Sequence, residues 1–467
     1  MTGPRDPGAG AGLEVDSLAI ELGERFAAAG HQLYLVGGVV RDLLLGRLAS
    51  DADFDFATDA TPAETTKIVR GWADAVYLVG VRFGTVGARR SGRVLEVTTF
   101  RQEVYAEEHR KPAVTFAKEI ETDLSRRDFT INAMAMELPG GQLVDPHGGV
   151  RHLAERILDT PLEPELAFSD DPLRMVRAAR FVAQLEVAPA PRVVAAISSM
   201  RERLSIVSAE RIRAEFDKLV VAATPSRGLD LAVQTGLAEL FLPELPALSL
   251  EQDPVHKHKD VLRHTYAVVE NCDADDRVLR VAALLHDIGK PATRQITPGG
   301  VQFHHHEVVG ARMAAERMRE LRYPNHEIDD VAKLIELHLR FHGYGDGWSD
   351  AAVRRYVRDA GPLLDRLNQL TRADVTTGNR FRAKQFQALQ DDLEERIARL
   401  AEEENLEALR PPLDGRQVME HLDVEPGPVV GEALAYLMDL RLDRGPIDEA
   451  EAFRLLDAWA TERGAGG

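Results

Sequence analysis

Cysteine is almost absent from this sequence: Cys272 is the single one among 467 residues. One thiol cannot form an intramolecular disulfide, so the fold does not depend on disulfide bonds and fits a reducing compartment. Long apolar runs are also missing, because no segment approaches the roughly 18 residues that a membrane helix needs. Residues 1–15 lack the apolar core of a signal peptide and are expected to be a disordered lead. These absences predict a cytoplasmic protein with no membrane partner.

The sequence also lacks an excess of basic residues. Its formal net charge is −19 at pH 7, and an acidic chain is an unfavourable starting point for binding the phosphates of nucleic acid. The charge is unevenly distributed, however. Residues 171–230 contain ten Lys or Arg and seven Asp or Glu, while acidic residues concentrate toward the C-terminus. A basic surface on an acidic protein therefore remains possible.

The chain is too long for one ordinary domain, and its apolar content of 44% can fill several cores. Strands are expected at residues 33–36, 54–56, 94–100 and 134–138, whereas helical periodicity dominates from about residue 154 onward. Pro and acidic residues near 245–254 indicate a break. The pattern predicts an α+β protein in five parts: the lead at 1–15, a head at 16–153, a helical neck at 154–250, a histidine-rich domain at 251–377 and a helical C-terminal part at 378–467.

Gly37 and Gly38 stand between a predicted strand and a predicted helix, and Arg41 and Asp42 follow them. Glycines at such a turn let the backbone approach a ligand closely. The free N–H groups at the start of the helix attract an anion such as a triphosphate, and Arg41 adds a positive charge. An ordinary turn explains the same residues, so this motif carries little weight alone.

Asp53 and Asp55 are two positions apart on a predicted strand, so their carboxylates project from the same face. Two neighbouring carboxylates repel each other unless a cation lies between them. Mg²⁺ prefers carboxylate and phosphate oxygens, which makes the pair a candidate two-metal platform. Glu96, on a later strand, is a third candidate acid. A solvated strand face is the alternative explanation for all three.

Two later motifs supply cations. Residues 126–132 precede an apolar run, and their charged and amide side chains suit contacts with phosphate and ribose hydroxyls. Residues 170–181 begin a helix at Pro172, on which Arg174, Arg177 and Arg180 recur in steps of three along one face. Like charges stacked in this way destabilise a helix unless anions or acids meet them. A surface turn and a salt-bridged helix are the alternative explanations.

In their order along the chain, these motifs resemble the class II tRNA nucleotidyltransferases, which share a polymerase-β-type core with bacterial poly(A) polymerases. The resemblance runs from about Gln32 to Phe216 and ends with the segment Glu210–Phe216. It implies a head with a small mixed sheet and helices, followed by all-α neck, HD and C-terminal domains. It also implies that Asp53, Asp55 and Glu96 are catalytic, with Mg²⁺ on Asp53 and Asp55. The residues then expected to bind nucleotide are Gly37, Gly38, Arg41, Asp42, Arg126, Arg127, Asp128, Asn132, Asp171, Arg174, Arg177 and Arg180.

The resemblance further implies a choice of substrate. Asp171 and Arg174 would pair with the incoming base, because cytosine and adenine both offer an amine donor beside a ring-nitrogen acceptor, and guanine and uracil reverse that pattern. The residue before this Asp is usually Glu in the family and is Asp170 here. The expected reaction is addition of CMP, CMP and AMP to tRNA from CTP and ATP. Tyr105–Phe116 resembles a loop kept in CCA-adding members; poly(A) synthesis and CC- or A-addition alone remain alternatives.

Histidines concentrate in the predicted domain at 251–377. Six residues resemble, in order, the metal ligands of the HD superfamily of phosphohydrolases: His264, His286, Asp287, His306, His338 and Asp374. The resemblance implies one metal on His264, His286, Asp287 and Asp374 and a second on His306 and His338, with Mn, Ni, Fe or Co as candidates. Terminal or cyclic phosphates on RNA are the expected substrates. A domain that has lost hydrolysis and only packs against RNA or a partner is the alternative.

Three further points stay open at this stage. A hydrolase whose head only binds RNA is a separate possibility, and a purely RNA-binding protein is disfavoured by the intact Asp53 and Asp55. Leu413–Met419 resembles part of a helical tail that touches the tRNA elbow in related enzymes, although an acidic packing domain explains it equally well. The oligomeric state is either monomer or dimer.

Overall fold

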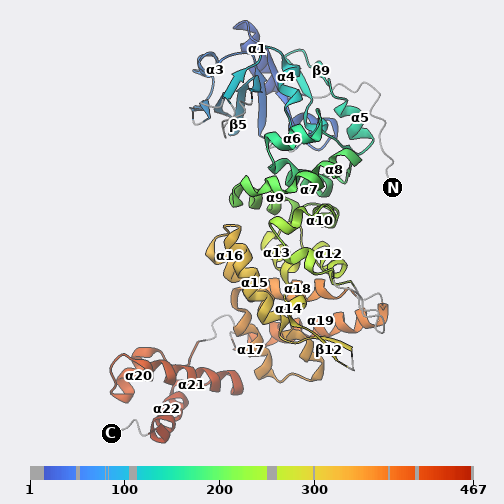
Figure 1. Ribbon diagram of the computed structural model, residues 1–467. Coiled ribbons are helices and arrows are strands. Elements are labelled where there is room, and N and C mark those ends of the chain that lie inside the picture. Colours follow the sequence, from blue (N-terminus) through green and yellow to red (C-terminus); the bar gives the residue numbers. More distant parts are fainter. Residues whose placement is uncertain are drawn as a thin grey trace. The chain divides into compact units, whose positions relative to one another are not determined.

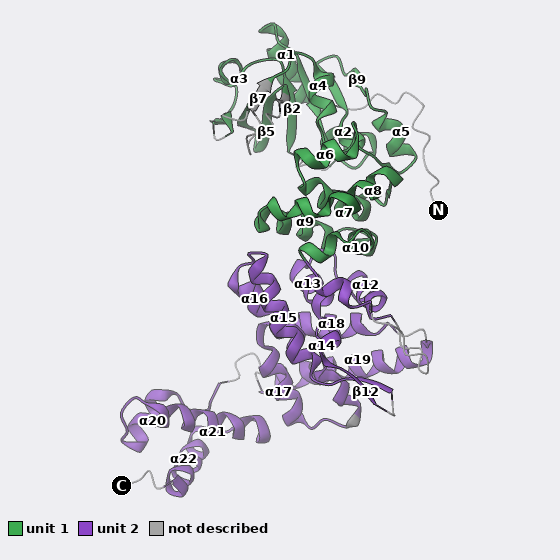
Figure 2. Cartoon of the chain, in the orientation of Figure 1, with its two compact units in different colours: residues 1–241 green, residues 242–467 purple. Residues whose placement is uncertain are grey.

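The computed structural model describes residues 15–48, 53–78, 80–81, 84–104, 113–249, 260–297, 300–376, 379–404 and 410–463. The chain divides into two compact units, residues 1–241 and 242–467 (Figure 2). Unit 1 carries the large sheet and unit 2 is mainly helical (Figure 1). This arrangement confirms the predicted α+β class, while the finer division into head, neck, HD and C-terminal domains stays a prediction.

The large sheet has seven strands in the order β3-β4-β5-β2-β1-β8-β9. Neighbouring strands are antiparallel except for β2 and β5, which are parallel. Two strands that the sequence predicted, at 33–36 and 134–138, therefore lie side by side. The strand bounds are β1 Leu33–Val36, β2 Phe54–Thr58, β3 Ala75–Tyr77, β4 Thr85–Arg90, β5 Arg93–Thr99, β8 Ala135–Leu138 and β9 Leu143–Val144.

Alternating side chains of the central strands fill cores on both faces of the sheet. Leu33 and Leu35 pack on one face with apolar residues of α1 (Ser17–Ala28) and α3 (Pro62–Val69). Tyr34 and Val36 pack on the other face with α4 (Ile120–Ser125). Because β1 and β2 are covered on both sides, the exposed Asp55 is exceptional within its strand, whose other four residues are buried. Burial of the neighbours fixes the direction in which this carboxylate points.

The remainder of unit 1 is helical apart from two small pairings, β6 (Arg101–Val104) with β7 (Ala113–Phe116) and β10 (Ile157–Leu158) with β11 (Ala188–Pro189). A long amphipathic helix, α7, packs against both α9 and α10. The helix bounds are α2 Gly38–Leu44, α5 Gly149–Ala154, α6 Pro164–Asp170, α7 Leu173–Leu185, α8 Pro191–Met200, α9 Ala209–Val220 and α10 Pro225–Gln234.

Unit 2 contains the remaining helices and one hairpin, β12 (Arg294–Thr297) with β13 (Gly300–Phe303). Its last three helices share a core of their own that includes Leu437 and Trp459. No described helix in either unit combines the length and the apolar content needed to cross a membrane. The helix bounds are α11 Glu244–Ala247, α12 Val261–Asn271, α13 Arg277–Leu285, α14 Lys290–Thr293, α15 His306–Glu320, α16 Asn325–Leu337, α17 Asp350–Ala360, α18 Leu364–Asp374, α19 Arg380–Glu404, α20 Gly415–Leu422, α21 Pro428–Arg444 and α22 Glu449–Arg463.

Candidate nucleotide-transfer site and metal centre

Three acidic residues gather at β2 and β5, two neighbouring strands in the interior of the large sheet. β2 and β5 run parallel, and their register places Asp55 directly opposite Glu96. Asp53 precedes β2 by one residue and is exposed, as are Asp55 and Glu96. The sequence predicted that these three acids act together. The pairing of β2 with β5 brings them together, although Glu96 lies 41 positions from Asp55 in the chain.

The ionised form of the Asp55 carboxyl is unfavourable unless a cation lies beside it. Loss of solvent around it raises its pKa most, and the negative charges of Glu96 and then Asp53 raise the pKa further, against the lowering effect of Arg127. Carboxylates that destabilise one another in this way are suited to a divalent cation, which hard oxygen ligands bind well. The residues present thus fit a metal ion at the carboxylates of β2 and β5.

The glycine turn predicted at the start of α2 is present. Gly37 has a φ of 78°, a conformation that favours glycine, and a side chain there would approach Arg127 Nη1 to 3.1 Å. Arg41 is buried and donates to both carboxylate oxygens of Asp42, at 2.8 and 2.9 Å, and to Asn132 Oδ1 at 2.7 Å. Hydrogen bonds therefore hold the Arg41 guanidinium in place, next to a glycine turn whose backbone a ligand can approach.

A buried ion-pair chain connects residue 128 to α7 and α9. Asp128 accepts from Arg177 Nε at 2.9 Å and Nη2 at 2.5 Å. Arg177 also contacts Glu215 Oε1 at 3.2 Å, and Arg180 lies 2.8 Å from Glu215 Oε2. Although burial acts to raise the pKa of Asp128, the charge and hydrogen bonds of Arg177 hold it below the usual value. The stacked arginines expected on α7 are thus met by acids, and Glu215 is the one that sequence reasoning missed.

These side chains line one cavity of about 580 Å³ in unit 1. It includes most of the predicted nucleotide-binding residues together with the catalytic candidate Asp55. Six of its residues were not predicted, namely Phe181, Gln184, Lys218 and the three residues 221–223 that follow α9. The predicted members of the lining are Gly37, Gly38, Arg41, Asp55, Arg127, Asp128, Asn132, Arg177 and Arg180.

A smaller hollow of about 260 Å³ adjoins the cavity, since Arg127, Asp128 and Arg177 line both. It contains the two residues expected to select the base, Asp171 and Arg174. Their backbones are joined, since the Arg174 N–H donates to the Asp171 oxygen at 3.0 Å, but their side chains have other partners.

Asp171 instead pairs with Arg211 at 2.7 Å, and Arg174 donates to the backbone oxygens of Arg126 at 2.5 Å and Ala167 at 3.3 Å. Arg211 is a residue that sequence reasoning quoted within a motif but did not assign to a site.

Two predicted nucleotide-binding residues lie outside both hollows. The guanidinium of Arg126 pairs with the buried Asp123, and Asp42 binds Arg41. Asp42 therefore supports Arg41, whereas Arg126 shares Asp123 with Arg127. The predicted loop at 105–116 lies largely outside the described residues, which resume at Ala113.

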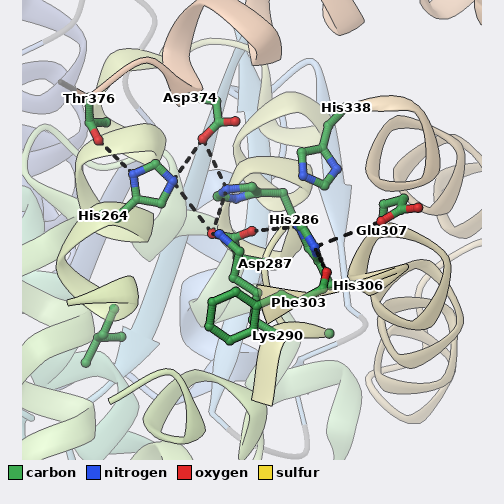
Figure 3. A network of polar contacts seen from close by, with 12 residues as sticks. His264, His286, Asp287, Lys290, Phe303, His306, Glu307, His338, Asp374 and Thr376 are labelled. Atoms are coloured by element: carbon green, nitrogen blue, oxygen red, sulfur yellow. Dashed lines mark hydrogen bonds and ion pairs between the residues drawn. The ribbon is translucent and has the colours of Figure 1, made fainter. Parts of the chain in front are cut away.

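The six residues of the predicted HD centre come together in unit 2. They lie at helix ends or beside them: His264 on α12, His286 and Asp287 after α13, His306 at the start of α15, His338 after α16 and Asp374 at the end of α18. Figure 3 shows the rings of His264, His286 and His338 arranged around Asp287 and Asp374. A side chain at Gly289 would lie 2.2 Å from the His306 oxygen, so this glycine permits the close approach of α15.

Each histidine ring is held by its Nδ1 atom. Nδ1 bonds to the Ala283 oxygen in His286, to the Phe303 oxygen in His306 and to the Ile335 oxygen in His338, at 2.7, 2.9 and 2.6 Å respectively. Nδ1 of His264 bonds to the Thr376 hydroxyl at 2.7 Å. This leaves the Nε2 atoms as the potential ligands, which is the orientation of metal-binding imidazoles. His264 Nε2 lies 2.8 Å from Asp374 Oδ1.

Potential ligand atoms form two trios, each within 4.8 Å: His264, His286 and Asp374, and Asp287, His306 and His338. Asp287 contacts both, because its Oδ2 lies 3.2 Å from His286 Nε2 and its Oδ1 lies 3.3 Å from His306 Nε2. The sequence had grouped Asp287 with the first set alone. Its two oxygens instead face different sets, while Lys290 Nζ lies 2.6 Å from Oδ2.

Three buried atoms at this centre have no hydrogen-bond partner: His286 Nε2, Asp287 Oδ1 and His306 Nε2. Burial acts to lower the pKa of His286, but the charges and hydrogen bonds of Asp287 and Asp374 together outweigh it and raise that pKa to about 10. Burial and the charge of His286 lower the pKa of His338 to about 3. Buried polar atoms without partners are costly, and a divalent cation would take the place of protons on these ligands, so the donor set fits bound metal.

Comparisons with known proteins agree with this geometry. The family model described as the poly(A) polymerase head domain matches residues 33–159, and a probable RNA- and SrmB-binding site of polymerase A matches 187–248. The HD domain model matches residues 258–402. The three matched segments include the HD centre and the sheet residues of the nucleotide-transfer site, whereas Asp171 and the arginines of α7 lie between the first two segments.

Among curated relatives, an A-adding tRNA nucleotidyltransferase of Deinococcus radiodurans is 34% identical over 92% of this chain and 95% of its own length. A CCA-adding enzyme of Geobacillus sp. is 44% identical over 46% of this chain, a match that spans about half of the relative (52%). The solved CCA-adding enzyme of Bacillus stearothermophilus with CTP is 26% identical, with a TM-score of 0.70, over 96% of this chain and 98% of that protein.

We expect the full chain to bind a divalent transition metal at the HD centre, and His286→Ala to lower its affinity for Co²⁺ at least about tenfold, because loss of even a supporting residue costs this much. Calorimetric titration with Co²⁺ measures the effect. His304→Ala is the matched control, since His304 is exposed two positions before His306. Equal Co²⁺ affinity in all three proteins would contradict the assignment.

Proposed function

The chain belongs to the tRNA nucleotidyltransferase family, and from that premise we propose that it adds CMP, CMP and AMP to the 3′ end of tRNA. CTP and ATP are the nucleotide substrates, and pyrophosphate is released at each step. The observation that carries the proposal is that Asp55, which lies opposite Glu96 and two positions after Asp53, lines a cavity together with Arg41, Arg127 and other cations. A carboxylate cluster beside a cationic hollow suits a metal-bound polyphosphate.

Mg²⁺ held by Asp53 and Asp55 would stabilise charge on the attacking and leaving oxygens of the transfer. The protein residues do the remaining work. Gly37 and Gly38 give the phosphates access to backbone N–H groups, and Arg41 and Arg127 meet their charge. The RNA 3′-oxygen forms a bond to the α-phosphorus, its proton leaves, and the bond to the β-phosphate bridging oxygen breaks as pyrophosphate departs.

Choice of C and A is assigned to Asp171 and Arg174. Both line the smaller hollow, where a carboxylate can accept from the exocyclic amine of either base and a guanidinium can donate to the ring nitrogen. Guanine and uracil would leave these buried groups unpaired, which costs binding energy. Arg211 competes for Asp171 through its 2.7 Å ion pair, so entry of a base requires that contact to be shared or exchanged.

The number of nucleotides added is the finer part of the proposal. The relative that matches over nearly its whole length is an A-adding enzyme, whereas the relatives with the higher identity over about half their length are CCA-adding. Resemblance of residues 105–116 to the loop of CCA-adding members supports complete addition. CC-addition, A-addition and open-ended poly(A) synthesis are therefore outcomes that the experiment must separate.

A second activity is favoured by the HD centre. Two trios of ligand atoms joined by Asp287 would hold two divalent transition metals, with Mn, Ni, Fe or Co as candidates. Such a pair activates water for attack on phosphorus. We propose a phosphohydrolase acting on terminal or cyclic phosphates of RNA, in a unit separate from the transferase head.

The products formed from a tRNA that ends before CCA test the main proposal. With Mg²⁺ we expect two C units from CTP alone and a complete CCA, followed by arrest, from CTP with ATP. Gel analysis at single-nucleotide resolution measures this. A lengthening A tract would identify a poly(A) polymerase, addition of A only to tRNA-CC would identify an A-adding enzyme, and no incorporation would remove the transferase proposal.

Arg174→Ala tests base selection. Removing the donor should lower the preference for CTP and ATP over GTP and UTP at least about tenfold, since an unpaired buried polar group costs 1–3 kcal/mol. Single-turnover rates with each of the four nucleotides measure the preference. Arg151→Ala, at an exposed arginine of the same unit, is the control. An unchanged preference in Arg174→Ala would show that selection lies elsewhere.

A further inference from the structure

Lys218 lies on α9, outside every motif that the sequence analysis assigned to a site, yet it lines the same cavity as Gly37, Gly38 and Arg41. Its side chain is exposed to the cavity and solvent. Within the ranges that the structure describes, no carboxylate lies within ion-pair distance of its ammonium group. A ligand in the cavity is therefore the natural partner for this charge.

The other cations of the lining already have acids as partners. Each guanidinium is matched by a carboxylate at 3.2 Å or less: Arg41 with Asp42, Arg127 with Asp123, Arg177 with Asp128 and Arg180 with Glu215. Asp55 is the acid of the lining that remains for a metal ion. Lys218 thus differs from the arginines of the lining, because its ammonium group forms no ion pair with a described carboxylate.

Arg180 lies where neighbouring positive charges repel one another. It is 7% exposed, and its Nε is buried without a hydrogen-bond partner. It shares Glu215 with Arg177, which also pairs with Asp128. Burial, and next the charge of Arg177, lower the pKa of Arg180 to about 10. An anion bound here would relieve this repulsion.

Helices α7 and α9 both contribute side chains to the two hollows, and along each helix the residues of the smaller hollow come first. Along α7, Arg174 lines the smaller hollow, Arg177 lines both hollows, and Gln184 lines the larger cavity. Arg174 and Gln184 are about 15 Å apart along the helix axis, from ~1.5 Å per residue. On α9, Arg211 lines the smaller hollow and Lys218 the larger one, in the same order. A nucleotide with its base at Asp171 and Arg174 would extend its phosphates toward Lys218.

We propose that Lys218, with Gln184 beside it, binds the β- and γ-phosphates of the incoming nucleotide and the pyrophosphate formed from them. This residue would distinguish nucleoside triphosphates from monophosphates at a distance from the base-selecting residues. The inference rests on the proposed nucleotidyl transfer, because it takes the position of the base and of the metal from that function. Arg180 supports the subsite, and Lys218 supplies the charge that is free to meet the ligand.

Equilibrium binding to the full chain separates this inference from the transfer reaction. Calorimetry with Mg-ATP, with AMP and with inorganic pyrophosphate should show Lys218→Ala weakening ATP and pyrophosphate at least about tenfold, as expected for a charged hydrogen bond. AMP affinity should be unchanged. Lys218→Arg should restore most of the affinity, and Lys67→Ala, at another exposed lysine of unit 1, should match the unaltered chain.

The same variants in the addition assay should show a raised KM for CTP and ATP and an unchanged KM for tRNA. Equal affinity of Lys218→Ala for ATP, or equal weakening of AMP and ATP, would overturn the inference. A raised KM for tRNA alone would also overturn it and assign Lys218 to an RNA phosphate. If the unaltered chain binds ATP but incorporates nothing, the proposed function fails while the binding comparison still decides the role of Lys218.

Discussion

The ion pair between Asp128 and Arg177 is the contact on which the nucleotide site depends. Asp128 is buried, accepts from the Phe129 backbone and from Asn132 as well as from Arg177, and lies where the two hollows meet. Removing one partner of such a buried pair costs about 3–5 kcal/mol, because the other charge is left without compensation. Through Glu215 the pair continues to Arg180, so one chain of charges sets the positions of base-selecting and phosphate-facing side chains together.

The second centre uses a different physical arrangement. In unit 1 the acids are exposed and can meet a hard cation, whereas in unit 2 one carboxylate and three imidazoles are buried, and backbone oxygens hold these imidazoles. The first set suits a metal that arrives with a nucleotide, and the second suits a resident transition metal. These separate sets of ligands support two activities in one chain, each with its own metal requirement.

Much of this organisation could be predicted from the sequence. The pairing of residues that are far apart in the chain could not. Asp53 and Asp55 follow from strand periodicity, and the order of motifs identified the six HD residues. The pairing of Asp55 with Glu96 depends on strand register, and that of Arg177 with Glu215 depends on the packing of α7 on α9. Strand β4 was missed because its segment, Thr85–Arg90, ends in two arginines and begins without a long apolar run. Lys218 resembles any exposed helical lysine until the cavity is seen.

The central claim is that nucleotide addition occurs at the carboxylates Asp53, Asp55 and Glu96 and is independent of the HD centre. The most direct measurement compares the addition rate of Asp53→Ala with that of Asp287→Ala on tRNA lacking CCA. Loss of a metal ligand at the reacting phosphate removes several kcal/mol of stabilisation, so Asp53→Ala should lower the rate at least about a thousandfold. Asp287→Ala should retain the rate of the unaltered chain. Equal losses in the two variants, or normal addition by Asp53→Ala, would contradict the account.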